Sequence, residues 1–346
     1  MREGILSLIG DTPLVRLTRV LEDIKFELYG KLEAFNPGGS IKDRTAYSIL
    51  KNAIDEGHIK PDTVVIESSS GNMGIGLAQA CAYLGLQFIC VVDPKTTQQN
   101  IQILKAYGAE VDMVRDPDPV TKEFLHARIE RVNTLLRTFP NAYWPNQYAN
   151  IFNANAHRHT MREIVMALDG KVDYLFCAAS TCGTLRGCAE YVQENGLATK
   201  VVAVDAVGSV IFGGPPIKRL IPGHGAARRP ELYLPNLAHR SIHVTDLDCI
   251  IGCRRLLRKE AIITGGSSGA VLMALALIQE DIPHGATCVM IFPDRGERYL
   301  DTIYSDEWVA EHFGDVSHLW EDFDLTFTES LIEEPVNTLS AAGMAL

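Results

Sequence analysis

A lysine lies just after a glycine pair, where a helix is expected to begin. The sequence predicts a tight turn at NPGGS, residues 36–40, with Ser40 as N-cap and Lys42 in the first turn of a helix over 41–57. The positive end of a helix lowers the pKa of a neighbouring amine and favours the neutral form that attacks carbonyl carbons. Lys42 is therefore a candidate for imine chemistry, although the motif alone fits a solvated surface lysine equally well.

A second turn, rich in hydroxyl groups, follows the predicted strand TVVIE at residues 63–67. This turn contains Ser69, Ser70, Gly71 and Asn72. Hydroxyl and free N–H groups at the start of a helix can bind an anion such as a carboxylate. The glycines are spaced G-x-x-G-x-G, unlike the G-x-G-x-x-G of dinucleotide-binding turns, and a plain capped helix is the alternative.

Two further turns combine glycine with hydroxyl side chains. The turn after the predicted strand VDYLFC consists of Ser180, Thr181, Cys182, Gly183 and Thr184. It opens a helix, which is a position that suits a phosphate group, and the absence of G-K-[ST] argues against a nucleoside-triphosphate loop. The last turn, GGSSGA, contains Ser267 and opens an apolar helix. Taken alone, it could be a simple helix cap.

Short apolar runs alternate with helical segments and must position these turns. The runs expected to be strands are 26–32, 63–67, 88–92, 110–114, 172–177, 200–205 and 286–292. Helices are expected over 41–57, 72–85, 97–107, 119–138, 153–168, 184–195, 246–260 and 268–280. This alternation predicts an α/β fold with parallel sheets covered on both faces. The Gly- and Pro-rich stretch 206–240 is expected to be a long functional loop.

Charge is distributed unevenly along the 346 residues. The chain has 32 Lys+Arg and 43 Asp+Glu, a formal net charge of −11. From Asp294 onward there are 13 acidic and two basic residues, so the rest of the chain is neutral. A neutral body offers no basic face for nucleic acid or for anionic lipid. We interpret residues 320–346 as an acidic C-terminal appendage or tail.

Composition narrows the class of protein further. With 47% hydrophobic and 22% charged residues the chain is typical of globular proteins, of a length that suggests about two domains. No segment has the roughly 20 apolar residues of a membrane helix, and the first residues lack the features of a signal peptide. The eight cysteines lie mostly in apolar runs, as expected in a reducing cytoplasm. We expect no metal site, because His157, His159 and His224 lack metal-ligand spacing and the Cys249–Cys253 pair has no second pair.

Together the four turns and the segment PDRGERY, residues 293–299, closely resemble the fold-type II pyridoxal-phosphate enzymes of the cysteine synthase family. The motifs run in family order from GDTPL at 10–14 to about Asp301. The resemblance implies a tryptophan synthase β-like fold, with two open twisted α/β domains and pyridoxal 5'-phosphate in the cleft between them. It also implies a large domain of residues 1–38 and 147–319, a small mobile domain of residues 39–146, and a cytoplasmic homodimer.

The resemblance assigns a role to each turn. Lys42 looks like the lysine that holds the cofactor covalently and later moves the Cα proton. Asn72 matches the residue that bonds the ring hydroxyl, Ser267 the one at the pyridine nitrogen, and residues 180–184 the phosphate loop. The α-carboxylate pocket is expected to consist of Ser69, Ser70, Gly71, Asn72 and Gln147. A neutral serine at the pyridine nitrogen makes the ring a moderate electron sink, which suits α,β-elimination.

Several positions depart from ordinary cysteine synthases. Met73 replaces a threonine, Tyr148 a phenylalanine and Arg295 a small residue, while Ser180–Cys182 replace a glycine-rich loop. The loss of glycine puts the backbone geometry of that loop in question. Tyr148 and Arg295 add polar and cationic groups that a small nucleophile such as sulfide does not require. Arg128, in the helix before residues 142–150, is another candidate for the site, although a solvated helix face would also fit it.

These departures are similar to one branch of the family, the enzymes that make N-(2-amino-2-carboxyethyl)-L-glutamate for 2,3-diaminopropionate, siderophore and peptide-antibiotic synthesis. By resemblance, the α-amino group of L-glutamate replaces the phosphate of O-phospho-L-serine through an α-aminoacrylate. Both substrates are anionic, so additional arginines are expected. Arg228, in the long loop, is the candidate for the leaving phosphate, and a surface arginine is its alternative.

Three other functions are compatible with parts of the sequence. The nearest is a cysteine synthase that uses O-acetylserine or O-phosphoserine with sulfide. A catalytically silent paralogue that acts as a binding protein is disfavoured, because it need not keep Lys42, Ser70, Asn72 and Ser267 together. A dinucleotide-binding oxidoreductase is disfavoured by the glycine spacing.

Overall fold

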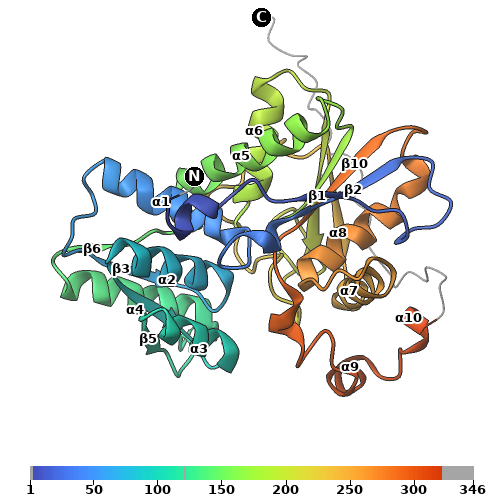
Figure 1. Cartoon of the computed structure of the whole chain (residues 1–346). Coiled ribbons are helices and arrows are strands. Elements are labelled where there is room, and N and C mark those ends of the chain that lie inside the picture. Colours follow the sequence, from blue (N-terminus) through green and yellow to red (C-terminus); the bar gives the residue numbers. More distant parts are fainter. Residues whose placement is uncertain (1–2, 121, 322–346) are drawn as a thin grey trace, which may run out of the picture.

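A computed structural model describes residues 3–120 and 122–321 of the protein, which contain two β-sheets. The six-stranded sheet has the order β1-β2-β10-β7-β8-β9 and the four-stranded sheet the order β5-β4-β3-β6. Figure 1 shows the sheets in two separate bodies, with α1 of one body against α5 of the other. The tail predicted for residues 320–346 lies almost wholly outside the described residues.

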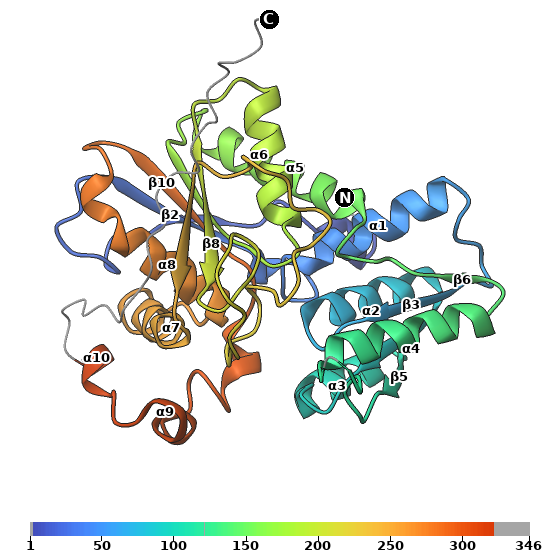
Figure 2. The ribbon, with the colours of Figure 1, turned by 180° about the vertical axis from the view of Figure 1, so that it is seen from behind.

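The six-stranded sheet is parallel except at one edge. Its strands are β1 (Leu14–Arg16), β2 (Glu27–Leu32), β7 (Tyr174–Ala178), β8 (Lys200–Ala206), β9 (Arg240–Val244) and β10 (Thr287–Phe292). Only β1 runs antiparallel to its neighbour, with Val15 opposite Gly30. Helices α5 (Ile151–Ala167) and α6 (Gly183–Glu194) cover one face, and α7 (Asp246–Glu260) and α8 (Gly266–Leu277) cover the other (Figures 1 and 2).

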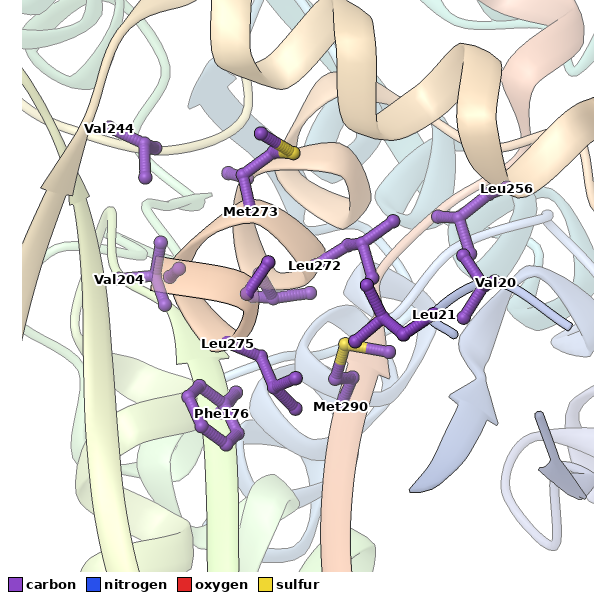
Figure 3. Close-up of a cluster of buried hydrophobic side chains, with 14 of the residues drawn as sticks. Val20, Leu21, Phe176, Val204, Val244, Leu256, Leu272, Met273, Leu275 and Met290 are labelled. Carbon is purple, nitrogen blue, oxygen red and sulfur yellow. The ribbon is translucent and has the colours of Figure 1, made fainter. Parts of the chain in front are cut away.

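Alternating residues of the central strands divide between two cores. In β7, Phe176 faces α8, whereas Leu175 and Cys177 face α5 and α6. Figure 3 shows Phe176 and Met290, which are paired in register, with Leu272 and Leu275 of α8 in the first of these cores. Helix α8 is buried along its length, because it is apolar on all sides and lies between the sheet and α7. The sheet therefore gives a rigid base to any loop at its strand ends.

The four-stranded sheet is parallel throughout and has its own cores. Its strands are β3 (Val64–Ser68), β4 (Gln87–Val92), β5 (Glu110–Met113) and β6 (Ala142–Tyr143). Helices α1 (Lys42–Asp55), α2 (Asn72–Leu84) and α3 (Gln98–Ala106) pack on one face, and α4 (Phe124–Thr138) packs on the other. Separate cores are consistent with the predicted two-domain division, whose boundaries remain a prediction.

The seven predicted strands lie within two residues of their observed bounds, and the predicted helices lie close to theirs. The predicted start of α4, residue 119, is wrong by five residues. Lys122 has a left-handed backbone conformation, φ 59°, through which an α-helix cannot run. The strands β1, β6 and β9 and the last helices, α9 (Asp306–Phe313) and α10 (His318–Glu321), were not predicted. Short 3₁₀ helices occupy Ile5–Leu8, Glu33–Phe35, Gln279–Asp281 and Gly296–Tyr299.

The cysteine side chains agree with their interpretation from the sequence. All eight cysteines are free and buried, as expected of small hydrophobic residues. Among residues 3–120 and 122–321, no group of three or more His, Cys, Asp or Glu residues is placed to hold a metal ion. In the same part of the chain, no helix has both the length and the apolar character needed to cross a membrane.

Candidate active site

One cavity gathers most of the residues singled out in the sequence. From the body of the four-stranded sheet it is lined by Ser69, Ser70, Gly71, Asn72, Met73 and Arg128. From the other body it is lined by Ser180, Thr181, Cys182, Gly183, Thr184, Ser267 and Asp294. Lys42, Gln147 and Tyr148 complete the lining. The cavity lies at the carboxyl ends of β3, β7 and β10, where open α/β sheets place their ligand sites.

Lys42 begins α1 and so lies in its first turn, as predicted, and it lines the cavity. Ser40 Oγ accepts a hydrogen bond from the Lys42 N–H at 3.2 Å, although the N-cap position itself is occupied by Ile41. Burial lowers the pKa of Lys42 to about 8, against the opposing effect of the Asp294 carboxylate. The main cause of the lowered pKa is therefore loss of water around the ammonium group, whereas the sequence had suggested the helix dipole.

Asp294 is a buried carboxylate that lines the cavity. Its Oδ2 accepts hydrogen bonds from Asn72 Nδ2 at 2.7 Å and from Tyr299 Oη at 2.5 Å. Burial raises the pKa of Asp294. Asn72 begins α2, so this hydrogen bond connects the small-sheet body to the end of β10 in the large one. Asp294 thus fixes the Asn72 amide beside Lys42.

The β3–α2 turn is shaped by Ser69. Its Oγ accepts hydrogen bonds from the backbone N–H groups of Gly74 at 2.9 Å and Gly71 at 3.3 Å. Asn100 Nδ2 supports the turn from α3 by donating to the Ser70 carbonyl at 3.0 Å. The first N–H groups of α2 have no partner within the helix, so the turn presents donors to the cavity in the way a carboxylate requires.

The β7–α6 turn keeps the backbone conformation of a glycine-rich loop at Cys182, although residues 180–182 contain no glycine. Cys182 has φ 63°, a left-handed conformation that glycine adopts without strain. The turn therefore keeps a glycine-like backbone with a cysteine side chain that is 2% exposed. Gly183 then begins α6, and a Cβ there would lie 2.2 Å from Asn153 Oδ1, so only glycine fits. Helix α6 points its N-terminal donors at the cavity, and Ser267 lies similarly at the start of α8.

Asn153 connects three parts of the site. Its Nδ2 donates to the Gln147 carbonyl at 2.7 Å and to Thr181 Oγ1 at 3.0 Å. Its Oδ1 accepts from Thr45 Oγ1, one turn after Lys42, at 3.1 Å. The residue is buried on α5. It therefore sets the relative positions of the lysine helix, the Gln147 segment and the β7–α6 turn.

Arg128 is the one arginine among the described lining residues. Its side chain is 11% exposed, and its Nε and Nη1 atoms are buried without a hydrogen-bond partner. The ion-pair partner of Arg128, Asp93, lies 3.2 Å from Nε. A buried guanidinium with free donors is costly unless an anion joins it, so Arg128 is suited to bind an anionic ligand.

The structure does not bring Arg228 or Arg295 to this cavity. Arg228 is exposed in the long loop 207–239, of which only Gly223 lines the cavity. Arg295 is also exposed, and its Nε donates to the Ala34 carbonyl at 3.1 Å. It lies against Gly39, on the outer side of the turn that precedes Lys42. Its neighbour Asp294 turns into the site instead.

Sequence reasoning missed Asp294, Asn153, Glu67 and Asp93. Asp294 lies within the PDRGERY segment, but the role in the site was given to the arginine beside it. Glu67 immediately precedes the SSSGN turn, and Asp93 immediately follows β4. Polar residues at the ends of buried parallel strands were a signal for both. Asn153 had no local signal, because its three partners come from distant segments.

Comparison with known proteins agrees with this geometry. A model of the family described as pyridoxal-phosphate dependent enzyme matches residues 5–294. A protein from Ralstonia nicotianae named N-(2-amino-2-carboxyethyl)-L-glutamate synthase is 47% identical over 309 residues, which is 89% of this chain and 91% of that protein.

Solved structures are similar over nearly the whole described chain. A hydrogen sulfide-producing enzyme, Fn1220, from Fusobacterium nucleatum superposes with a TM-score of 0.81 at 33% identity, covering 87% of this chain and 100% of that one. An O-acetylserine dependent cystathionine beta-synthase from Helicobacter pylori gives a TM-score of 0.81 at 31% identity, covering 87% and 98%.

Proposed function

The chain belongs to the pyridoxal-phosphate dependent enzymes of fold type II, and from that premise we propose that it joins O-phospho-L-serine to the amino group of L-glutamate. The products would be N-(2-amino-2-carboxyethyl)-L-glutamate and phosphate. A β-replacement of this general kind follows from the family and from the named relative. The choice of substrates is supported chiefly by Arg128, a buried cation of the cavity lining whose Nε and Nη1 make no hydrogen bond.

The residues present fit the cofactor. The N-termini of α2, α6 and α8 converge on one cavity, which suits a group that carries a phosphate and a phenolic oxygen. An amine with its pKa lowered to about 8 is available for covalent attachment. Residues 180–184 would hold the phosphate, Asn72 the ring hydroxyl, and Ser267 the pyridine nitrogen. When bound, pyridoxal phosphate supplies an electron sink that acidifies the Cα–H bond of the amino acid.

The protein residues then have separable tasks. Lys42 Nζ would accept the Cα proton, and burial keeps a useful fraction of its amine neutral near pH 8. The β3–α2 turn, Ser69 to Asn72, would hold the α-carboxylate, with Gln147 beside it. Asp294 would keep the Asn72 amide in place through its 2.7 Å hydrogen bond.

Arg128 would recognise an anionic group that a small neutral nucleophile lacks. Phosphoserine carries a phosphate and glutamate carries a second carboxylate, and both match the hydrogen-bonding pattern of a guanidinium. Tyr148 lines the cavity with Arg128, and burial raises the pKa of its hydroxyl, which therefore stays protonated and can donate. A sulfide acceptor would leave Nη1 of this buried arginine without a hydrogen bond.

A domain arrangement is part of the proposal. Residues 1–38 and 147–319 would form the large domain, and residues 39–146 the small mobile one. The support is that each sheet has its own pair of hydrophobic cores. A homodimer is proposed on the family resemblance alone, and light scattering on purified protein tests it.

Steady-state turnover of the holoenzyme tests the substrates. We expect phosphate release from O-phospho-L-serine to depend on L-glutamate, with the adduct identified by mass spectrometry. O-acetyl-L-serine with sulfide should be the poorer pair. Faster turnover with sulfide would move the assignment to cysteine synthesis, and no turnover with any serine derivative would favour a binding protein.

A further inference from the structure

Arg128 needs a counter-charge to stay at the cavity wall. A lone arginine on the exposed side of a helix would extend into water, because solvation of the guanidinium is favourable. Yet Arg128 on α4 is 11% exposed and lines the cavity. An anionic group of the protein must therefore hold it there when no substrate is present.

Two carboxylates face the guanidinium. Glu67 is buried beneath the β3–α2 turn, and burial raises its pKa to about 7. Its Oε1 accepts from Ser68 N at 2.8 Å and Trp144 Nε1 at 3.1 Å, and its Oε2 accepts from Gln147 N at 3.2 Å. Glu67 is thus occupied in holding the Gln147 segment.

Asp93 is the second carboxylate and is held rigidly. It follows β4 directly and is 3% exposed. Its Oδ1 accepts from the Lys95 N–H at 2.8 Å, and its own carbonyl accepts from Thr96 N at 3.0 Å. Its Oδ2 lies 3.2 Å from Arg128 Nε. A closed turn at the end of a buried strand therefore fixes one oxygen toward Arg128.

We propose that Asp93 is a positioning residue that presents Arg128 to an anionic group of the substrate, either the acceptor's carboxylate or the donor's phosphate. The carboxylate of Asp93 faces Nε, whereas Nη1 has no hydrogen bond, so Asp93 orients the guanidinium and leaves Nη1 unused. The identity of the substrates in this inference rests on the proposed function, whereas its test uses unreactive probes. Asp93 itself does not line the cavity, so it acts through Arg128.

The same helix provides a matched control. Three residues along α4, Arg131 donates to Asp112 from Nε at 3.0 Å and Nη2 at 2.7 Å. That pair is more exposed, at 42% for the arginine side chain, and Arg131 does not line the cavity. Asp112→Asn therefore breaks an arginine–aspartate pair on α4 without touching the site.

Calorimetric titration of the holoenzyme with two unreactive probes, glutarate and inorganic phosphate, tests the proposal. Asp93→Asn keeps the Oδ1 acceptor and should weaken at least one probe about tenfold, in line with a charge-assisted hydrogen bond. Weakening of glutarate assigns Arg128 to the acceptor, and weakening of phosphate assigns it to the leaving group. Asp112→Asn should bind both probes like the unmodified protein.

A double-mutant cycle separates a role of Asp93 in orienting Arg128 from a nonspecific disturbance of the site. Once Arg128→Gln has removed the guanidinium, adding Asp93→Asn should weaken binding no further. Additive losses, unchanged binding by Asp93→Asn, or no binding of either probe by the unmodified protein would each overturn the proposal. Failure of the proposed function shows instead as absent L-glutamate turnover with the Asp93 effect on the probes intact.

Discussion

On the side of the six-stranded sheet, the cavity is lined by the beginnings of α6 and α8 and by Asp294, whose polar groups are mostly backbone N–H, hydroxyl and carboxylate atoms. On the side of the four-stranded sheet, it is lined by the β3–α2 turn and by the guanidinium of Arg128. The first side, the large-sheet wall (Ser180–Thr184, Ser267 and Asp294), depends on backbone conformation. The second, the small-sheet wall (Ser69–Met73 and Arg128), carries a charged side chain with free donors.

Under the proposed function, this difference would separate cofactor binding from substrate choice. Backbone donors at helix starts depend weakly on side-chain identity, so the large-sheet wall keeps its shape although Cys182 stands in a glycine-like conformation. A guanidinium is specific in charge and geometry, so the small-sheet wall can discriminate among nucleophiles. Changes on the two walls should therefore produce different kinds of defect.

The largest effect is expected for Lys42, which lies between the walls. Lys42→Ala should lower phosphate release from O-phospho-L-serine by about 10³-fold or more, because a positioned proton acceptor and the covalent attachment are both lost. Lys51→Ala, at an exposed lysine of the same helix, is the control and should be nearly silent. Substantial turnover by Lys42→Ala would remove this residue from the mechanism.

A smaller and more selective effect is expected on the small-sheet wall. Arg128→Gln should lower kcat/KM for the anionic substrate that it binds by roughly 10- to 100-fold, the value of a charge-assisted hydrogen bond. Cofactor binding, followed by visible absorption, should be unchanged. Arg131→Gln is the matched control, and an equal loss in both variants would mean that α4 is merely disturbed.

The pH dependence of Lys42 acylation tests whether burial lowers the pKa of its amine. With a pKa of about 8, its neutral fraction rises through pH 8, so acylation of Lys42 in the cofactor-free protein should accelerate about tenfold between pH 7 and pH 9. Below pH 7 the amine is protonated and labelling should be slow. Peptide mapping by mass spectrometry measures the rate. A midpoint near the ordinary lysine value would contradict burial as the controlling factor.

The smallest effect concerns the backbone of the large-sheet wall. Cys182→Val should lower the free energy of unfolding by about 1–3 kcal/mol, because a β-branched residue is strained at φ 63°. Cys182→Ser, which is unbranched and similar in size, is the control and should be milder. Thermal unfolding of both variants gives the comparison, and equal stability would show that the turn has changed conformation.

Local sequence patterns predicted most of the secondary structure and the family of the protein. Apolar runs and helical periods defined the main strands and helices, because each depends on neighbouring residues. The order of the Gly/Ser-rich turns identified the family and placed Lys42, Asn72, residues 180–184 and Ser267 in one cavity. The two-residue strand β6 escaped prediction because so short a strand depends on its partner.

Of the three candidate arginines, the tertiary structure brings only Arg128 to the lining of the cavity. From the sequence, all three were candidates for the site, and for Arg128 and Arg228 a surface position was the stated alternative. Packing of α4 beside β3 and β4 brings Arg128 into the cavity, whereas a hydrogen bond to Ala34 holds Arg295 outside. The partners of Asn153 and of Asp294 come from segments far apart in the chain. The sequence alone determined which chemical groups are available, because residue type and local spacing carry that information. Only the fold determined which of them meet, because long-range packing sets the distances between them.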